Sequence, residues 1–305
     1  MTWFFIALIG PLLYAMTNHI DKVLLEKYFK ESGVGTLILF SSLLSILALP
    51  FLFWADSTVF SVGWFNMSIM ALVGTLNMLV LWFYLLAMRD EEASIVIVFY
   101  QLVPVFGLIL GYFILNETLN KLELIAMAII ILGTTIISFE IDAENKFKLR
   151  RQTISLMLAA SFCWALGSVI FKFVALEENV WRSLFWEHVV LVIFGIIIFI
   201  FKSSYRKSFL SALKNNSKAI LSLNVANETL YMVGNLVFAF SYLLAPIALV
   251  LLVDSFQPIF VLGIGIFLTV FFPHVSVENI QAKHLWQKFI AICITGIGTY
   301  LLFIS

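Results

Sequence analysis

The sequence predicts an all-α integral membrane protein with ten transmembrane helices, arranged as an inverted 5+5 repeat. The first observation behind this prediction is composition: 62% of the residues are apolar, 12% are charged, and the mean hydropathy is +1.06. A soluble fold with so few polar residues could not cover its surface with them, so lipid must be the solvent. The second observation is that the second half of the chain repeats the first.

The repeat consists of short matches that keep their order along the chain. Tyr14-Ala15, Asn18 and Lys22 align with Trp164-Ala165, Ser168 and Lys172; Asn77 and Tyr84-Leu85-Leu86-Ala87 align with Asn235 and Tyr242-Leu243-Leu244-Ala245; Pro104 aligns with Pro258. Because each half holds an odd number of predicted helices, the second half enters the membrane from the opposite side. Inverted repeats of this kind are typical of secondary transporters.

Each helix is predicted from an apolar run of about 20 residues, the length that crosses a hydrocarbon core of ~30 Å. A spanning segment must satisfy its own backbone hydrogen bonds, so each run is expected to be helical. The runs lie at 2–20, 35–54, 66–88, 93–115 and 122–140, and then at 153–175, 183–201, 219–244, 247–272 and 287–304. We therefore divide the chain into a first repeat, 1–140, a hydrophilic linker, 141–152, and a second repeat, 153–305.

Two further patterns concern packing and orientation. Gly107 and Gly111 form a small-xxx-small pair, which lets a neighbouring helix approach closely. Lys and Arg concentrate in the loops after the first, fifth and seventh runs, whereas the loops of the other face offer only Lys121 and Arg182. Basic loops stay in the cytoplasm. This pattern therefore predicts that both termini lie outside it.

One block of the first half carries a family resemblance. It comprises Ala93-Ser94, Gln101-Leu102-Val103-Pro104-Val105-Phe106, Leu115-Asn116-Glu117-Thr118-Leu119 and Leu132-Gly133. This block resembles the EamA-type repeat of the drug/metabolite transporter superfamily. The second half keeps Pro258 and Gly296. At the turn that corresponds to Glu117 it has a longer loop, 273–284, and no matching Glu. The resemblance implies ten helices, an inverted repeat, and transport of small metabolites without a cofactor.

The strongest candidate site lies on the run 219–244. Asn224, Asn227, Glu228, Tyr231 and Asn235 fall within an arc of roughly 100° on a helix. Lipid would leave their amides unpaired, so this face must meet other helices or a cavity. We predict that Glu228 is the main charge of a substrate pocket. The alternative is an interhelical hydrogen-bond network that binds no ligand.

The run 247–272 supplies a second candidate site. Asp254 and Gln257 share a face beside Pro258, which removes a backbone hydrogen bond and frees a carbonyl. Charged groups at this depth are costly and usually functional, and broken helices often mark transporter sites. Tyr100 occupies the position of Asp254 in the first half. The alternative is a protonated Asp254 bonded to a neighbouring helix.

Aromatic residues add to this pocket. Tyr14 and Trp164 occupy the same repeat position, and each has a polar residue four positions later, Asn18 and Ser168. Aromatic rings beside carboxylates suit an organic cation. The predicted substrate-binding residues are Glu228, Asp254, Asn224, Asn227, Tyr231, Asn235, Gln257, Tyr14, Asn18, Trp164, Ser168, Asn77 and Tyr100.

Several charged residues have two interpretations. Glu187 and His188 could act in transport, but an interfacial ion pair with Arg182 explains Glu187 equally well. His19 and Asp21, at the end of the first run, are ambiguous in the same way. Lys22 and Lys172 are expected to extend to the lipid headgroups. Glu117, with Thr118, is expected to cap the helix that begins near residue 122.

Other functional classes lack their signatures. The four histidines show no metal-ligand spacing, and the sequence has no GxSxG motif, P-loop or Rossmann glycines, so we predict no metal, no cofactor and no catalytic residues. A net charge of zero gives no footprint for nucleic acid. The expected partners are a small-molecule substrate and membrane lipid, with the chain a monomer or a homodimer.

These observations predict a secondary active transporter of a small polar metabolite, leaning to a cationic or zwitterionic amine or amino acid. It would work by alternating access, either by exchange or coupled to protons carried by Glu228 and Asp254. The expected location is the cell inner (plasma) membrane. Two alternatives stay open: an intramembrane lipid-modifying enzyme that uses Glu187 and His188, and a membrane scaffold that transports nothing.

Overall fold

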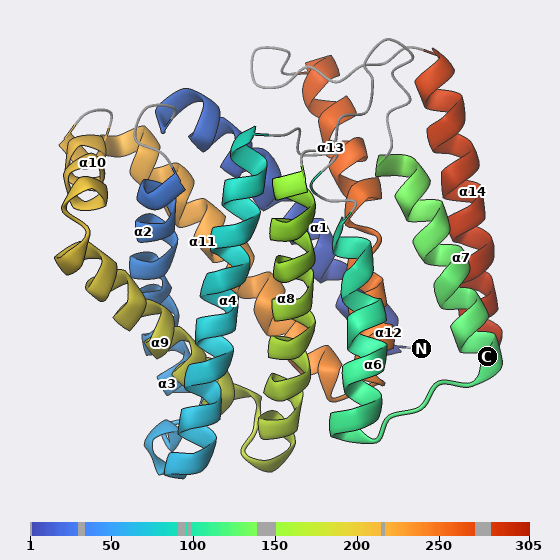
Figure 1. Cartoon of the computed structure of the whole chain (residues 1–305), viewed down its shortest axis with the longest axis horizontal. Coiled ribbons are helices and arrows are strands. Elements are labelled where there is room, and N and C mark those ends of the chain that lie inside the picture. The colour runs from blue at the N-terminus through green and yellow to red at the C-terminus, as the bar shows by residue number, and fades with distance from the viewer. Residues whose placement is uncertain are drawn as a thin grey trace.

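A computed structural model describes residues 2–29, 34–90, 96, 99–138, 151–214, 217–271 and 282–305, and these ranges are almost entirely helical (Figure 1). Most of the predicted linker, 139–150, lies outside the described residues. So do the start of the predicted fourth helix, at 93–95, and most of the long loop of the second half, 272–281.

The first half contains a helical element at every predicted run. The elements are α1 (Thr2–Val23), a π-helical turn η1 (Leu24–Tyr28), α2 (Val34–Leu44), η2 (Ser45–Leu47), α3 (Ala48–Ala55), η3 (Val59–Ser61), α4 (Trp64–Asp90), η4 (Phe99–Leu102), α6 (Val103–Leu115) and α7 (Lys121–Ser138). The second predicted span is therefore two α-helices joined by a 3₁₀ turn. The fourth span changes from 3₁₀ to α geometry one residue before Pro104, which has no backbone N–H to continue a helix that starts earlier.

The second half contains α8 (Arg151–Glu177), α9 (Val180–Phe201), α10 (Ser203–Lys214), α11 (Ser217–Tyr242), α12 (Ile247–Asp254), α13 (Gln257–Phe271) and α14 (Ala282–Ile304). The predicted ninth span is broken into α12 and α13 just before Pro258. Helix α10 was not predicted. It buries none of its residues and lies at the upper left end of the molecule in Figure 1. Its amphipathic pattern suits a position along the membrane surface.

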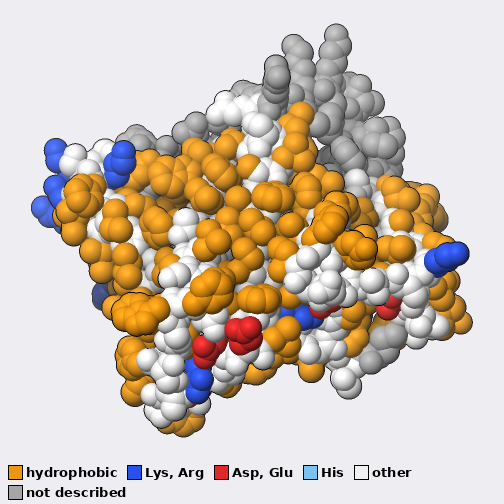
Figure 2. All heavy atoms as spheres, turned by 60° about the horizontal axis from the view of Figure 1, so that its bottom comes forward, with side chains coloured by type: hydrophobic (Ala, Val, Ile, Leu, Met, Phe, Trp, Pro, Cys, Tyr) orange, Lys and Arg blue, Asp and Glu red, His pale blue; other side chains and the backbone are white. Residues whose placement is uncertain are grey.

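Among the described residues, six helical spans are long and apolar enough to cross a membrane: Thr2–Val23, Val34–Ala55, Trp64–Met88, Gln152–Glu177, Val180–Phe201 and Ile247–Phe271. Two shorter apolar helices, Phe99–Leu115 and Phe289–Ile304, accompany them. Hydrophobic side chains cover most of the molecular face shown in Figure 2, with charged side chains in a few small groups. The protein is therefore a multi-pass integral membrane protein.

The helices of the two halves interleave. Helix α1 packs against α11, α12 and α13, while α8 packs against α4 and α6. Helix α9 contacts both α2 and α4, and α6 contacts α12. Helices α7 and α14 pack along each other at one side of the molecule (Figure 1). A site in the centre of this bundle can therefore draw on both halves.

Glycines set the closest helix contacts, as predicted for Gly107 and Gly111. A Cβ atom on Gly107 would lie 2.6 Å from Leu251, and one on Gly111 would lie 2.8 Å from Ile247, so α12 presses directly on α6. The late glycines of the second half differ in their surroundings. Gly296 faces open space among the described residues, whereas Gly298 packs against Ile130 of α7. The glycine that lets α14 approach α7 is therefore Gly298.

Gly133 provides a direct test of this packing. A Cβ atom there would lie 2.4 Å from Thr295 Oγ1 and 2.7 Å from the backbone nitrogen of Thr295, which cannot move aside alone. We expect Gly133→Leu to separate α7 from α14 and to cost about 1–3 kcal/mol of stability, seen as a lower midpoint of thermal unfolding in detergent. Gly296→Leu, on the open face of α14, is the matched control. Equal midpoints for the two variants would show that α7 and α14 do not pack in this way.

Candidate functional site

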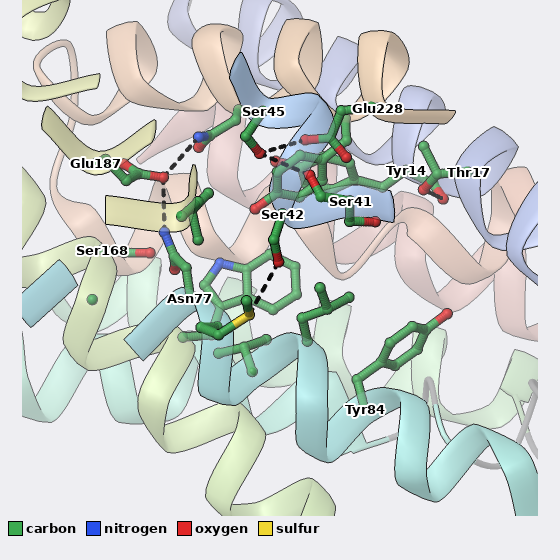
Figure 3. Close-up of a pocket in the computed structure, with 18 of the residues that line it drawn as sticks. Tyr14, Thr17, Ser41, Ser42, Ser45, Asn77, Tyr84, Ser168, Glu187 and Glu228 are labelled. Carbon is green, nitrogen blue, oxygen red and sulfur yellow. Dashed lines mark hydrogen bonds between the residues drawn. The ribbon is translucent and has the colours of Figure 1, made fainter. Parts of the chain in front are cut away.

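A cavity of ≈ 150 Å³ lies in the centre of the bundle, between the two halves of the chain. This volume holds several water molecules or a small organic molecule. Helices α1, α2, α4, α8, α9 and α11 all contribute lining residues, and Figure 3 shows their side chains converging from the surrounding helices. The cavity is therefore formed by the tertiary packing of both halves and by neither alone.

The structure brings together most of the residues that the sequence singled out. Those that line the cavity are Tyr14, Asn18, Asn77, Tyr100, Trp164, Ser168, Asn227, Glu228, Tyr231, Asn235 and Gln257. Asn224 and Asp254 are buried but lie outside the lining. Asn224 uses its amide to donate to the carbonyl of Ile220 in its own helix, at 2.7 Å. Asn224 was expected at the pocket because it shares a helix face with Glu228; its side chain is instead held by its own helix.

Two carboxylates of the lining are linked through neighbouring residues of α11. Glu228 is 4% exposed and accepts a hydrogen bond of 2.9 Å from the hydroxyl of Ser45, the first residue of η2. Asp21, near the end of α1, accepts a bond of 2.7 Å from the amide of Asn227, the residue before Glu228. Both donors are neutral, so the carboxylates keep their capacity to bind a cation or a proton.

A third carboxylate, Glu187 of α9, occupies a different part of the cavity. Its Oε1 atom accepts hydrogen bonds from Asn77 at 2.8 Å and from Asn235 at 3.1 Å (Figure 3). These two asparagines match each other across the sequence repeat. The ion pair between Glu187 and Arg182 that the sequence suggested is wrong. Arg182 instead binds Asp56 at 3.2 Å and Glu178 at 3.3 Å at the end of the helices.

Arg182, Asp56 and Glu178 form a cluster at the end of the helices, in which the Asp56 carboxylate accepts several hydrogen bonds. The hydroxyl of Thr58 and the amide of Asn179 donate to its carboxylate, as does the backbone nitrogen of Thr58. These bonds, of which the one from the Thr58 side chain is the largest cause, hold the pKa of the Asp56 carboxyl well below its usual range. Arg182 therefore pairs with Asp56 and Glu178 and not with Glu187.

Aromatic rings form much of the remaining wall. The ring of Tyr14 stacks on that of Tyr231 at a centroid distance of 5.7 Å and meets Trp164 edge-on at 6.2 Å. Tyr100 contacts the same Trp164 edge-on at 4.9 Å. Gly234 permits this arrangement, because a Cβ atom there would lie 2.6 Å from the ring of Tyr14. The lining thus combines carboxylates, amides and the faces and edges of aromatic rings.

The two repeat-matched lysines differ from each other, and only Lys172 departs from the prediction. Lys22 is exposed at the end of α1. Lys172, expected at the headgroups, is buried: its ammonium lies 2.5 Å from Glu117 and donates to the carbonyl of Ala245 at 2.8 Å. Lipid-facing lysines extend to water, but Lys172 faces inward from α8 and finds a carboxylate there. Within the described chain, no Lys or Arg lines the cavity.

The expected role of Glu117 as the cap of the next helix is also wrong. Its Oε2 atom accepts a bond of 2.6 Å from the backbone nitrogen of Ile247, at the start of α12 in the other half. Helix α7 is capped by Asn120 and Glu123, which exchange side-chain and backbone hydrogen bonds of 2.9 and 2.7 Å. Asn116, in the left-handed region with φ of 54°, turns the chain so that Glu117 points towards α12.

Comparison with known proteins agrees with this architecture. Residues 1–139 match the EamA-like transporter family. The match therefore covers the first half of the chain. A WAT1-related protein of Arabidopsis thaliana is 25% identical over 162 residues, which is 51% of this chain and 42% of the relative. A protein crystal structure superposes with a TM-score of 0.64 at 13% identity, covering 99% of this chain and 98% of that one, and shares the fold.

The EamA-like assignment confirms the family predicted from the sequence. The family's description names transport and no enzymatic reaction, so it lends no support to a lipid-modifying enzyme. The geometry agrees: His188 does not line the cavity, and its Nδ1 atom lies 2.9 Å from the carbonyl of Leu184 in its own helix. Over the described ranges, no three His, Cys, Asp or Glu side chains gather closely enough to hold a metal ion.

Asp254 is buried outside the lining of the cavity. It is 4% exposed, and both of its carboxyl oxygens lack a hydrogen-bond partner among the described residues, as do Ser255 Oγ and Gln257 Oε1. Unpaired buried polar atoms are rare in native proteins and call for a functional explanation.

Sequence reasoning gave too little weight to Asp21 and Glu187 and overlooked Ser41, Ser42 and Ser45. The serines lie at the wall of the cavity on α2 and η2 (Figure 3). A signal existed, because hydroxyl residues clustered in an otherwise apolar span often face other helices. Asp21 and Glu187 gave no such signal, since both lie near the ends of their apolar runs, where charged groups usually reach water.

Proposed function

We propose that this protein is a secondary active transporter that carries a small cationic or zwitterionic metabolite by alternating access. The observation that carries the proposal is the charge of the cavity: Asp21, Glu187 and Glu228 line it, and the described lining contains no basic side chain. An anion would meet unneutralised carboxylates in a low dielectric, at a cost of several kcal/mol. A cation would be attracted to the same groups.

The aromatic wall supports the same substrate class. Tyr14, Tyr231 and Trp164 stand beside the carboxylates, and rings of this kind attract ammonium groups through cation–π interactions. The predicted contacts of Asn18, Asn77, Asn227, Asn235, Ser168, Gln257 and Tyr100 with substrate are part of this proposal. Their amides and hydroxyls would orient the polar groups of the substrate.

We further propose the 5+5 inverted repeat as the transport machinery, with repeats at 1–140 and 153–305 and a linker at 141–152. Packing supports it, because contacts occur in matched pairs: α1 on α11 corresponds to α8 on α4, and α6 on α8 corresponds to α12 and α13 on α1. The two spans that carry the repeat-matched prolines are also interrupted just before their proline, Pro104 in α6 and Pro258 in α13. Two such halves would offer two packings of similar energy, as alternating access requires.

The transport cycle would be driven by protons or by exchange, with Glu228 and Asp254 as the proton carriers. Glu228 lines the cavity, so a substrate cation and a proton would compete for it. Asp254 is buried outside the lining, and its two oxygens have no partner among the described residues, so a proton would neutralise its charge there. We place the protein in the cell inner (plasma) membrane, as a monomer or a homodimer, with both termini outside the cytoplasm.

Proton coupling is tested by Asp254→Asn in proteoliposomes. In the wild type, an outward proton gradient should drive uptake of an organic cation several-fold above the rate without a gradient. Asp254→Asn should remove this stimulation, because Asn cannot carry a proton, while exchange of internal for external substrate continues. The matched control is Glu177→Gln, at the exposed end of α8. A variant that still responds fully to the gradient would exclude Asp254 as a proton carrier.

A further inference from the structure

Two separated acidic centres define the length of the cavity. The first consists of Asp21 and Glu228, and the second is Glu187. Helix α11 spans both centres, because it carries Glu228 itself and also Asn235, which donates to Glu187 at 3.1 Å. Residues 228 and 235 are seven positions apart, which is about two helical turns or roughly 10.5 Å along the axis, on nearly the same face. Figure 3 shows Glu187 and Glu228 on opposite sides of the pocket.

In the part of the chain that the structure describes, no basic side chain neutralises either centre. Glu228 is held by a serine hydroxyl, Asp21 by one amide, and Glu187 by two amides on the same oxygen. All three side chains are buried, with exposures of 4%, 8% and 1%. Their remaining oxygens have no bond to a basic group in the described part of the lining. A buried carboxylate without a counter-charge is costly, so each centre favours a positive group in the ligand.

On α11 the wall between the two centres is aromatic. Tyr231 lies one helical turn after Glu228 and one turn before Asn235, with the ring of Tyr14 stacked on it, and Val73 and Leu191 also line the cavity. Apolar and aromatic surface of this kind suits a hydrocarbon chain. Along α11 the wall is therefore acidic at Glu228, aromatic at Tyr231, and acidic again where Asn235 holds Glu187.

We infer that the cavity takes a compound with two positively charged nitrogens at the ends of a short hydrocarbon chain, an α,ω-diamine. This inference rests on the proposed function and names the substrate class within it. A charged nitrogen lies about 2.8 Å from a carboxylate oxygen, so roughly 5 Å separates the two nitrogens if the centres are about 10.5 Å apart. At ~1.25 Å per bond, an extended chain of three methylene groups covers that distance, and chains of four or five cover it when they bend.

Simpler amines satisfy this site less well. A monoamine neutralises one centre and leaves the other buried without a counter-charge. A zwitterionic amino acid places its own carboxylate against one of the protein's carboxylates. Between Asp21 and Glu228, which interact electrostatically with each other, a single ammonium group relieves the repulsion of both.

The test is binding to the purified full-length protein in detergent, measured by isothermal titration calorimetry. The ligands are 1,4-diaminobutane, 1-aminobutane, 4-aminobutanoate, and a series of diamines from two to eight methylenes. We expect the four-carbon diamine to bind at least about tenfold more tightly than the monoamine or the amino acid, with an optimum at three to five methylenes. Removal of one buried charge partner commonly changes affinity by this much or more.

Two variants test whether Glu187 binds the second nitrogen of the diamine. Glu187→Gln keeps an oxygen for Asn77 and Asn235, and we expect it to reduce diamine affinity to the monoamine level while monoamine affinity stays unchanged. Glu177→Gln, on the surface, should match the wild type. Equal affinity for diamine and monoamine in the wild type would overturn the inference and leave the proposed cation transport intact. Failure of every amine to bind would overturn both the diamine inference and the proposed cation transport. If Glu187→Gln does not fold, the affinity of the wild type for the series of diamines tests the inference in its place.

Discussion

Replacing Glu228 by Gln should reduce substrate uptake by about tenfold or more while the protein folds normally. The change keeps the shape of the side chain and its hydrogen bond from Ser45, and it removes the charge that faces the cavity. Loss of a buried charge partner costs a bound ion about 2–5 kcal/mol, which exceeds a factor of ten in affinity. Uptake into proteoliposomes, measured against substrate concentration, should show the loss mainly as a raised KM if Glu228 holds the substrate.

The control for this prediction is Glu177→Gln, which removes a carboxylate from the exposed end of α8 and should transport like the wild type. Elution from a sizing column and the midpoint of thermal unfolding would establish that both variants fold. Normal transport by Glu228→Gln between about pH 5 and pH 8, the range in which folded proteins are usually most stable, would rule out Glu228 as the principal charge of the site.

Replacing Lys172 by Met should destabilise the protein by about 3 kcal/mol, the largest stability effect that we expect of a single charge. Lys172 bridges the Glu117 carboxylate of the first half and the Ala245 carbonyl of the second, and Glu117 in turn binds the first backbone nitrogen of α12. Met retains the apolar stem and removes the ammonium group. Glu117 then loses its counter-charge in a largely buried position, where it is 19% exposed.

A double-mutant cycle with Glu117→Gln isolates the pair. The double variant should lose less stability than the sum of the single variants, because neither side then carries an unpaired charge. Thermal unfolding in detergent would measure each variant. If Lys172→Met unfolds at the wild-type temperature, the ion pair between the halves does not contribute to the fold.

The sequence was sufficient to predict where the helices lie and which face of α11 is polar. Apolar runs of the right length occur only where helices formed, and Asn227, Glu228, Tyr231 and Asn235 follow helical periodicity closely enough to define one face. Helix α10 escaped prediction because it is polar and too short to span a membrane. The breaks near η2 and between α12 and α13 leave only weak local signals, such as Pro258.

Contacts between the halves could not be predicted in the same way. From the sequence, Glu117 had a plausible partner in the N-terminus of the next helix, and Lys172 had one in the lipid headgroups. Only the packing of α6, α8 and α12 brings the two together. Glu187 was undervalued for a similar reason: Arg182 is close in sequence, but Asn77 and Asn235 reach Glu187 from two other helices.

The central claim, that an acidic cavity between the two halves selects a cation, is tested most directly by ligand competition on the purified protein. A quaternary amine, a diamine and a sugar nucleotide would each be titrated by calorimetry at low and at high salt. We expect the amines to bind and the nucleotide to show no saturable binding, because three carboxylates and no basic side chain line the described cavity. Tighter binding of the nucleotide than of either amine would contradict this account.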